Sequence, residues 1–184
     1  EEFFNQLEAA IKGGVTMIQL REKDMEFPEF LKEAIKIRKL TRDYGVPLII
    51  NDSLPVALAC EADGLHIGQG DMAAKTARIL LGRDKILGVT AKTVSQGKAA
   101  KEAGADYLGS GAVFGSNTKP DAKYMTYETL SAICRSVDLP VAAIGGIDGG
   151  NIEKLKGSGI AGAAVVSGVW GKRDVEKAAR ELKK

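Results

Sequence analysis

The stretch VPLIINDSLPVALACEADGLHIGQGD, residues 46–71, contains one complete unit of the pattern that decides the fold. Its apolar run at 46–50 predicts a strand, the segment 53–60 predicts a helix, and the run 65–67 predicts a second strand. Both strand runs are apolar at consecutive positions, which is typical of a parallel sheet covered by helices. Polar residues follow each run. The unit therefore predicts two parallel strands with reactive side chains where they end.

The same pattern continues in both directions along the chain. Further strands are predicted at 15–20, 86–90, 107–111, 141–144 and 162–166, and most strands begin about 20 residues apart, the length of one strand–helix unit. Helices are predicted at 3–11, from Pro28 to just before Gly45, and at 73–81, 94–103, 127–137, 151–158 and 173–183. Seven strands alternating with helices fit either an open doubly wound sheet or a barrel of eight units.

The glycine pattern favours the barrel over the doubly wound sheet. A dinucleotide fingerprint fails after Gly109-Ser-Gly111, because Phe114 stands where a glycine is needed, and no phosphate-loop motif occurs. We therefore expect an α/β protein with a (β/α)8 TIM barrel that occupies residues 1–184 as a single domain. The 184 residues and the seven strands further predict that the barrel lacks its first strand and is truncated at the N-terminus.

The composition excludes several classes of protein. With 26 basic and 24 acidic side chains, the net charge of +2 provides no basic surface for nucleic acid or an acidic membrane. The longest apolar run, 159–169, is too short to span a bilayer. Two cysteines and one histidine exclude a disulfide scaffold and a two-histidine zinc motif. We expect a cytoplasmic protein. Its expected partners are small molecules, and the composition is compatible with a homo-oligomer.

In a barrel of this kind, functional side chains lie where the strands end. Gln19, Arg21 and Lys23 alternate along the end of the first predicted strand, so they are expected on one side of an extended segment, where they would suit an anionic ligand. The alternative is a solvated strand end in which arginine pairs with glutamate.

Acidic and amide side chains follow the next two strands. Asn51, Asp52 and Asp71 offer the oxygen ligands that Mg²⁺ prefers, with substrate phosphates completing its coordination. The alternative is a helix cap at both places, formed by Asn51-Asp52 before Ser53 and by Asp71 before the helix that starts near Ala73. Taken together, they favour a metal-bridged pyrophosphate site.

Three later segments are candidates for binding a further phosphate. Residues 115–119 supply hydroxyls and a lysine, although an ordinary surface turn is the alternative. Residues 143–147 and 165–168 are glycine-containing strand ends that can expose backbone N–H groups to a phosphate, and the alternative is that their glycines only form tight turns. His66, the only histidine, is interpreted as a hydrogen-bonded structural residue.

Taken as a set, these blocks resemble the thiamine-phosphate synthase family. The resemblance runs from about Gly13 to Trp170, in the family's order, and rests on the segments Gln19–Asp24, Asn51-Asp52, Gly64–Gln69 with Asp71, Thr118-Lys119, Ala143–Ile147 and Val165–Ser167. It implies a (β/α)8 barrel that joins 4-amino-5-hydroxymethyl-2-methylpyrimidine pyrophosphate to a thiazole phosphate and releases pyrophosphate.

The resemblance also implies roles for individual residues. Arg21, Lys23 and Lys119 would be catalytic, and Asp52 and Asp71 would hold Mg²⁺. The pyrimidine pyrophosphate would be bound by Gln19, Arg21, Lys23, Asn51 and Lys119, with Thr90 near the pyrimidine. The thiazole phosphate would be bound by Ser116, Thr118, Gly146, Val166 and Ser167.

Two positions depart from the family pattern, and two rival functions are less consistent with the sequence. Lys92 stands where relatives commonly have histidine, and Gly115-Ser116 replaces the usual Pro-Thr. A thiazole tautomerase of similar fold is disfavoured, because such relatives lack the Asn-Asp pair and the metal carboxylate and use that histidine. A non-catalytic phosphate-binding sensor barrel is disfavoured because the main metal and cation positions are intact.

Overall fold

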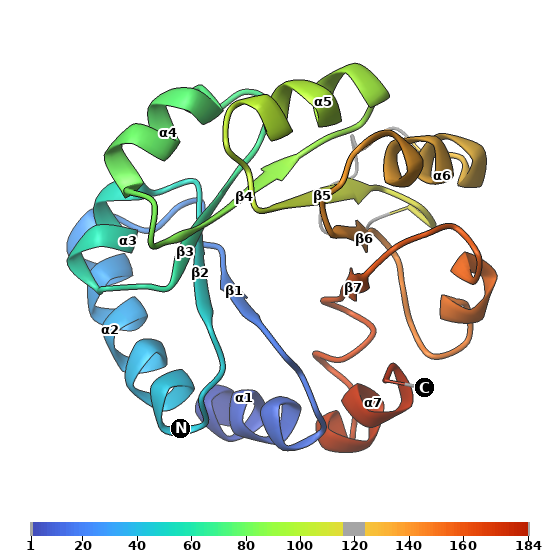
Figure 1. Ribbon diagram of the computed structural model, residues 1–184. Coiled ribbons are helices and arrows are strands. Elements are labelled where there is room, and N and C mark those ends of the chain that lie inside the picture. The colour runs from blue at the N-terminus through green and yellow to red at the C-terminus, as the bar shows by residue number, and fades with distance from the viewer. Residues whose placement is uncertain (1, 116–123, 184) are drawn as a thin grey trace.

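The computed structural model describes residues 2–115 and 124–183, which form an alternating series of strands and helices (Figure 1). The strands are β1 (Ile18–Leu20), β2 (Leu48–Asn51), β3 (Gly64–Ile67), β4 (Ile86–Thr90), β5 (Tyr107–Gly111), β6 (Val141–Ile144) and β7 (Gly162–Ala164). The helices are α1 (Glu2–Lys12), α2 (Phe27–Asp43), α3 (Leu54–Ala59), α4 (Ala74–Leu81), α5 (Val94–Glu102), α6 (Tyr127–Ser136), the 3₁₀ helix η1 (Ile152–Leu155) and α7 (Val175–Glu181). In the described part of the chain, no helix is long and apolar enough to cross a membrane.

The seven strands form one parallel sheet in which each strand pairs with the next along the chain. The sheet curls round until β1 and β7 lie on either side of a seam, and helices surround its outer face (Figure 1). No pairing joins β1 to β7 in the described residues, although α1 and α7 contact one another beside the seam. The predicted seven parallel strands are confirmed, and the sheet is a TIM-like barrel that is not closed.

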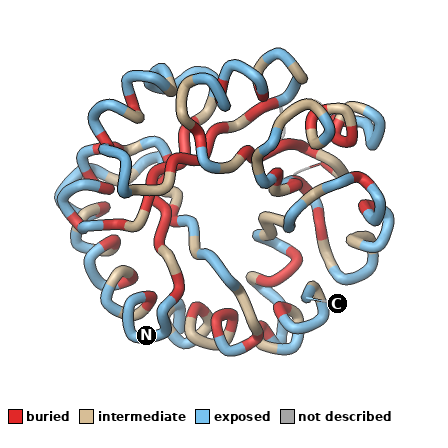
Figure 2. Tube along the Cα trace, in the orientation of Figure 1, coloured by how far each residue is buried: buried red, intermediate tan, exposed pale blue. Residues whose placement is uncertain are grey.

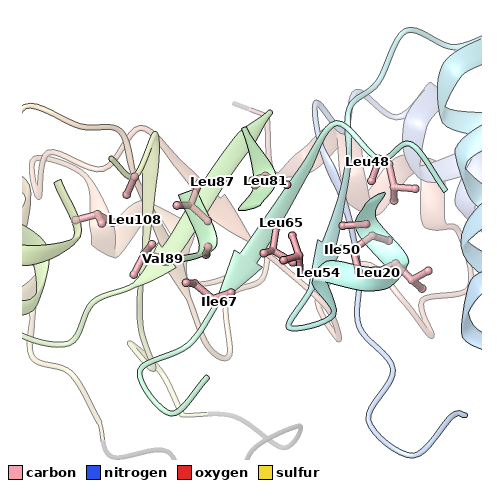
Figure 3. Packing of buried hydrophobic residues seen from close by; sticks show 14 of the residues in the cluster. Leu20, Leu48, Ile50, Leu54, Leu65, Ile67, Leu81, Leu87, Val89 and Leu108 are labelled. Atoms are coloured by element: carbon pink, nitrogen blue, oxygen red, sulfur yellow. The ribbon is translucent and has the colours of Figure 1, made fainter. Parts of the chain in front are cut away.

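Alternation along the strands separates two environments. Leu48, Ile50, Leu65 and Leu87 are fully buried among the helices, as the close view shows (Figure 3). Figure 2 shows the same division along the trace, with buried residues concentrated on the strands and on the inner sides of the helices. The intervening strand positions therefore face the interior of the barrel, and they include Gln19, Asn51, His66, Thr90 and Tyr107.

Several predicted segments are shorter than expected, and in two of them the structure shows the local cause. The helix predicted at 151–158 is wrong, because only the 3₁₀ helix η1 forms there, and Gly157 and Gly159 both adopt positive φ just beyond it. The strand predicted from residue 46 begins at Leu48. The N–H of Val46 bonds to the carbonyl of Thr41 at the end of α2, and Pro47 has no N–H to donate.

Arg78 of α4 connects several loops at the opposite end of the barrel from the predicted site. Its Nε donates to the carbonyl of Gly104 at 2.9 Å, and one Nη donates to the carbonyls of Gly82 and Lys85. The other Nη contacts the carboxylate of Asp106 at 2.5 Å. The Arg78 side chain is only 15% exposed. If this side chain is removed, water cannot fully replace the hydrogen bonds that it donates to the loop carbonyls.

Replacing Arg78 with leucine is expected to lower the free energy of unfolding by about 2–3 kcal/mol, because the carbonyls lose their donors. Urea titration followed by circular dichroism measures the change. Arg83, an exposed arginine of the same connection, provides the control, and Arg83→Leu should change stability by less than about 0.5 kcal/mol. Equal effects of the two substitutions would contradict this role of Arg78.

Candidate active site

The predicted site residues gather at the carboxyl ends of neighbouring strands. Gln19 lies in β1, Asn51 is the last residue of β2, and Thr90 is the last residue of β4. Because β1 to β4 are parallel and pair in sequence, these ends share one edge of the curved sheet. Arg21 follows β1 directly and is half-buried. The structure therefore brings these four side chains to the same end of the barrel.

Asp52 and Asp71 form a pair of facing carboxyl groups. Their side chains are within hydrogen-bonding distance of each other, although 18 residues separate them in the sequence. Burial raises the pKa of Asp52, and the hydrogen bond and charge of Asp71 raise it further, whereas Asn51 and the positive charge of Arg21 lower it. Asp52 also has a φ of 64°, a left-handed conformation that aspartate and asparagine tolerate better than most residues. The local backbone turn thus aims this carboxyl group at Asp71.

The helix-cap alternatives for these two residues are wrong. Ser53 caps α3 by accepting a hydrogen bond from the N–H of Val56, and the N-cap of α4 is Ala73, which makes no side-chain cap bond. Asp71 instead accepts a hydrogen bond from the N–H of Gly68 at 2.7 Å, which closes the loop after β3. Neither acidic side chain is used as a helix cap.

The donor set fits a hard divalent cation. Two carboxylates that face each other beside a buried amide supply oxygen ligands. Burial, and next the neighbouring Asp71, raise the pKa of Asp52, so a cation would help to keep this carboxylate charged. Among the residues that the structure describes, no group of three or more histidine, cysteine or acidic side chains is placed to hold a metal. A cation here would take its remaining ligands from water and substrate, the usual arrangement for Mg²⁺.

The remaining predicted residues make fewer contacts with the Asp52–Asp71 pair and its neighbours. β1 ends at Leu20 and the chain bends at Lys23 and Asp24, so the alternation expected from Gln19 to Lys23 does not continue, and Lys23 is exposed. Gly146, Val166 and Ser167 follow β6 and β7 and are exposed at the same end. Three predicted residues lie outside the described part of the chain: Ser116, Thr118 and Lys119.

The loop after β5 packs closely against the loop after β6. Phe114 donates its N–H to the carbonyl of Gly145, and a Cβ atom on Gly146 would lie only 2.7–2.8 Å from the carbonyl oxygens of Phe114 and Gly115. Gly146 has a φ of 64°, so glycine satisfies both the turn and the close approach. The sequence segment expected to hold a phosphate thus begins next to Gly146.

A polar chain in the barrel interior was not predicted. His66 Nδ1 lies 2.9 Å from Tyr107 Oη, and His66 Nε2 lies 3.0 Å from Thr90 Oγ1. Gln69 donates its side-chain N–H to the carbonyl of Thr90 at 2.5 Å. The interpretation of His66 as a hydrogen-bonded residue is confirmed, but Tyr107 was missed. The available signal was that polar residues and glycines occupy alternate positions of β3, β4 and β5.

Comparisons with known proteins agree with this geometry. The family model described as thiamine monophosphate synthase matches residues 1–169. The chain is 47% identical to the thiamine-phosphate synthase of Methanobrevibacter smithii over 184 residues, which cover 100% of this chain and 88% of that relative. It is 49% identical over 176 residues to the thiamine-phosphate synthase of Clostridium tetani, covering 96% of this chain and 84% of the relative.

A solved structure extends the similarity to three dimensions. Thiamine phosphate pyrophosphorylase from Pyrococcus furiosus matches with a TM-score of 0.90 and 37% sequence identity, over 97% of this chain and 86% of that chain. Sequence and structure therefore agree over nearly the whole length. The chain belongs to the thiamine monophosphate synthase family.

Proposed function

We propose that the carboxyl ends of β1 to β7 form the active site of a thiamine-phosphate synthase, the transferase activity that the family membership gives this chain. The reaction couples a pyrimidine methyl pyrophosphate with a thiazole phosphate and yields thiamine phosphate and pyrophosphate. The observation that carries the placement of the site is the Asp52–Asp71 pair with Arg21 beside it, a combination suited to a polyanion and a cation bound together.

In the proposed mechanism, the bond between the pyrimidine methylene carbon and the pyrophosphate oxygen breaks first. The electron pair leaves with pyrophosphate, and the lone pair of the thiazole nitrogen then forms the new C–N bond. Arg21, Lys23 and Lys119 stabilise the negative charge that develops on the leaving group. Gln19, Asn51 and Thr90 hold the pyrimidine pyrophosphate, so that its methylene carbon faces the second substrate.

Asp52 and Asp71 would hold Mg²⁺, which when bound neutralises charge on the pyrophosphate. The thiazole phosphate is assigned to Ser116, Thr118, Gly146, Val166 and Ser167. Of these residues, Gly146, Val166 and Ser167 are exposed beyond β6 and β7, where a phosphate can reach the backbone N–H groups. The mechanism requires no protein nucleophile.

Both substrates supplied with Mg²⁺ are expected to give pyrophosphate, measured by a coupled phosphate assay, and either substrate alone should give none. Binding of the substrates without release at saturating concentrations would support a sensor and contradict the proposal.

The cytoplasmic location, the single-domain organisation and a homo-oligomeric state stay predictions.

A further inference from the structure

Four side chains from four strands form a continuous hydrogen-bonded chain across the barrel interior. Gln19 of β1 bonds to the phenol of Tyr107 on β5, Tyr107 bonds to His66 on β3, and His66 bonds to Thr90 on β4. The middle of the chain is protected, since His66 is only 8% exposed, whereas Gln19 is exposed and Thr90 is half-buried. The two ends can therefore reach a bound molecule while the middle cannot.

Two glycines make room for this arrangement. In the sheet register, Gly88 of β4 lies between His66 and Tyr107, so the two rings meet across a position with no side chain. A Cβ atom on Gly88 would overlap the ring of Tyr107, and one on Gly109 would lie 3.0 Å from Cε1 of His66. The ring centroids are 5.5 Å apart. The backbone is thus shaped around the pair.

The direction of each hydrogen bond follows from the donors available. Burial raises the pKa of Tyr107, so its phenol keeps its proton. The hydrogen bond from Gln19 lowers this pKa, as expected when an amide N–H donates to the phenol oxygen. Tyr107 then donates its only proton to His66 Nδ1, which leaves the proton of a neutral imidazole on Nε2. His66 Nε2 donates in turn to Thr90 Oγ1.

This order fixes what the two ends offer to a ligand. With its N–H group directed at Tyr107, Gln19 presents its carbonyl oxygen, which is an acceptor. With its oxygen accepting from His66, Thr90 has its own O–H proton to donate. An acceptor and a donor at one end of the barrel match a ligand edge that carries an amino group and a ring nitrogen.

We propose that Tyr107 and His66 are positioning residues that set the donor and acceptor directions of Gln19 and Thr90, and so select an aminopyrimidine over its oxo analogue. The proposal rests on the proposed function, because Gln19 and Thr90 are there assigned to the pyrimidine substrate. Tyr107 and His66 act through the other two residues, and they take no part in breaking or forming a bond.

The test replaces Tyr107 with phenylalanine, which keeps the ring and removes the hydroxyl. The KM for the pyrimidine pyrophosphate is expected to rise about tenfold, the effect of one lost directing hydrogen bond, with little change in kcat and none in the KM for the thiazole phosphate. The 4-oxo analogue of the pyrimidine substrate serves as a competitive inhibitor. The variant should discriminate less between substrate and analogue, so the ratio of the analogue's inhibition constant to the substrate's KM should fall. His66→Asn, which breaks the same chain at its next member, should change the same two quantities.

Ser110→Ala provides a matched control. Ser110 is a fully buried residue of the same strand whose hydroxyl donates to the carbonyl of Ala91 at 2.9 Å, on the outer side of the sheet. Its loss should leave both KM values unchanged, whatever happens to the melting temperature. A Tyr107→Phe variant with a lower melting temperature but unchanged KM and discrimination would overturn the proposal and leave a structural role. Failure of the wild-type chain to release pyrophosphate would instead overturn the proposed function.

Discussion

Replacing Asp52 with asparagine is expected to reduce the rate of pyrophosphate release by about 10²–10³-fold, the usual effect of removing one charged group that stabilises a transition state. Asparagine preserves the side-chain shape and tolerates the φ of 64° at this position, so the backbone turn should survive. The lost property is the negative charge that would hold Mg²⁺ with Asp71. Steady-state kinetics at saturating substrates and increasing MgCl₂ measures the effect.

A second measurement, independent of activity, tests the same assignment. Mg²⁺ should raise the melting temperature of the wild-type protein by binding the folded state, and it should have little effect on Asp52→Asn. Without metal, the wild-type protein should lose this advantage in stability over Asp52→Asn. A raised pKa means that the folded protein favours protonated Asp52, a stabilisation present at low pH and lost as the pH rises through the raised pKa. At neutral pH the metal-free variant should therefore be at least as stable as the wild type.

Asp84 offers a matched control for this substitution, because it is an exposed aspartate in the loop after α4, at the opposite end of the barrel. Asp84→Asn should preserve both turnover and the Mg²⁺-dependent rise in melting temperature. Near-normal turnover in Asp52→Asn, or an undiminished response to Mg²⁺, would contradict the assigned role of Asp52.

The fold was predictable because its signals are local and repeated. Each strand is a short apolar run, and each polar group at a strand end follows that run directly, so the edge where they gather follows from parallel pairing alone. The failure at 151–158 has a local cause as well. Gly157 and Gly159 adopt positive φ just beyond η1 and interrupt the helix there, although the apolar spacing of the segment is helical.

The contacts inside the site were less predictable. The distance between Asp52 and Asp71 depends on the register of β2 with β3 and on the loop closed by Gly68, and neither is visible in the residue pattern. The same holds for Tyr107, whose partners Gln19 and His66 come from two other strands. The ring of His66 meets that of Tyr107 only because Gly88 lies between them in the sheet register. A lone histidine in an apolar strand indicated a bonded residue, but not which groups it joins.

Replacing Arg21 with alanine is expected to lower turnover by about 10²–10³-fold, because the cation closest in sequence to the end of β1 would no longer balance the charge on departing pyrophosphate. Its position supports this role, since Arg21 is half-buried and its charge is felt at Asp52, where it lowers the pKa against the effect of burial. Arg21→Lys should recover only part of the activity, because lysine keeps the charge but loses bidentate bonding to phosphate.

Product inhibition separates this role of Arg21 from a general loss of structure. If Arg21 contacts the leaving group, the inhibition constant of pyrophosphate should rise in Arg21→Ala, while the KM for the thiazole phosphate stays near the wild-type value. Arg135→Ala, which removes an exposed arginine of α6, should change neither quantity. Unchanged inhibition by pyrophosphate in Arg21→Ala would place the arginine away from the leaving group. Arg21 would then act through its charge on Asp52, whose pKa it lowers, and not on the leaving group.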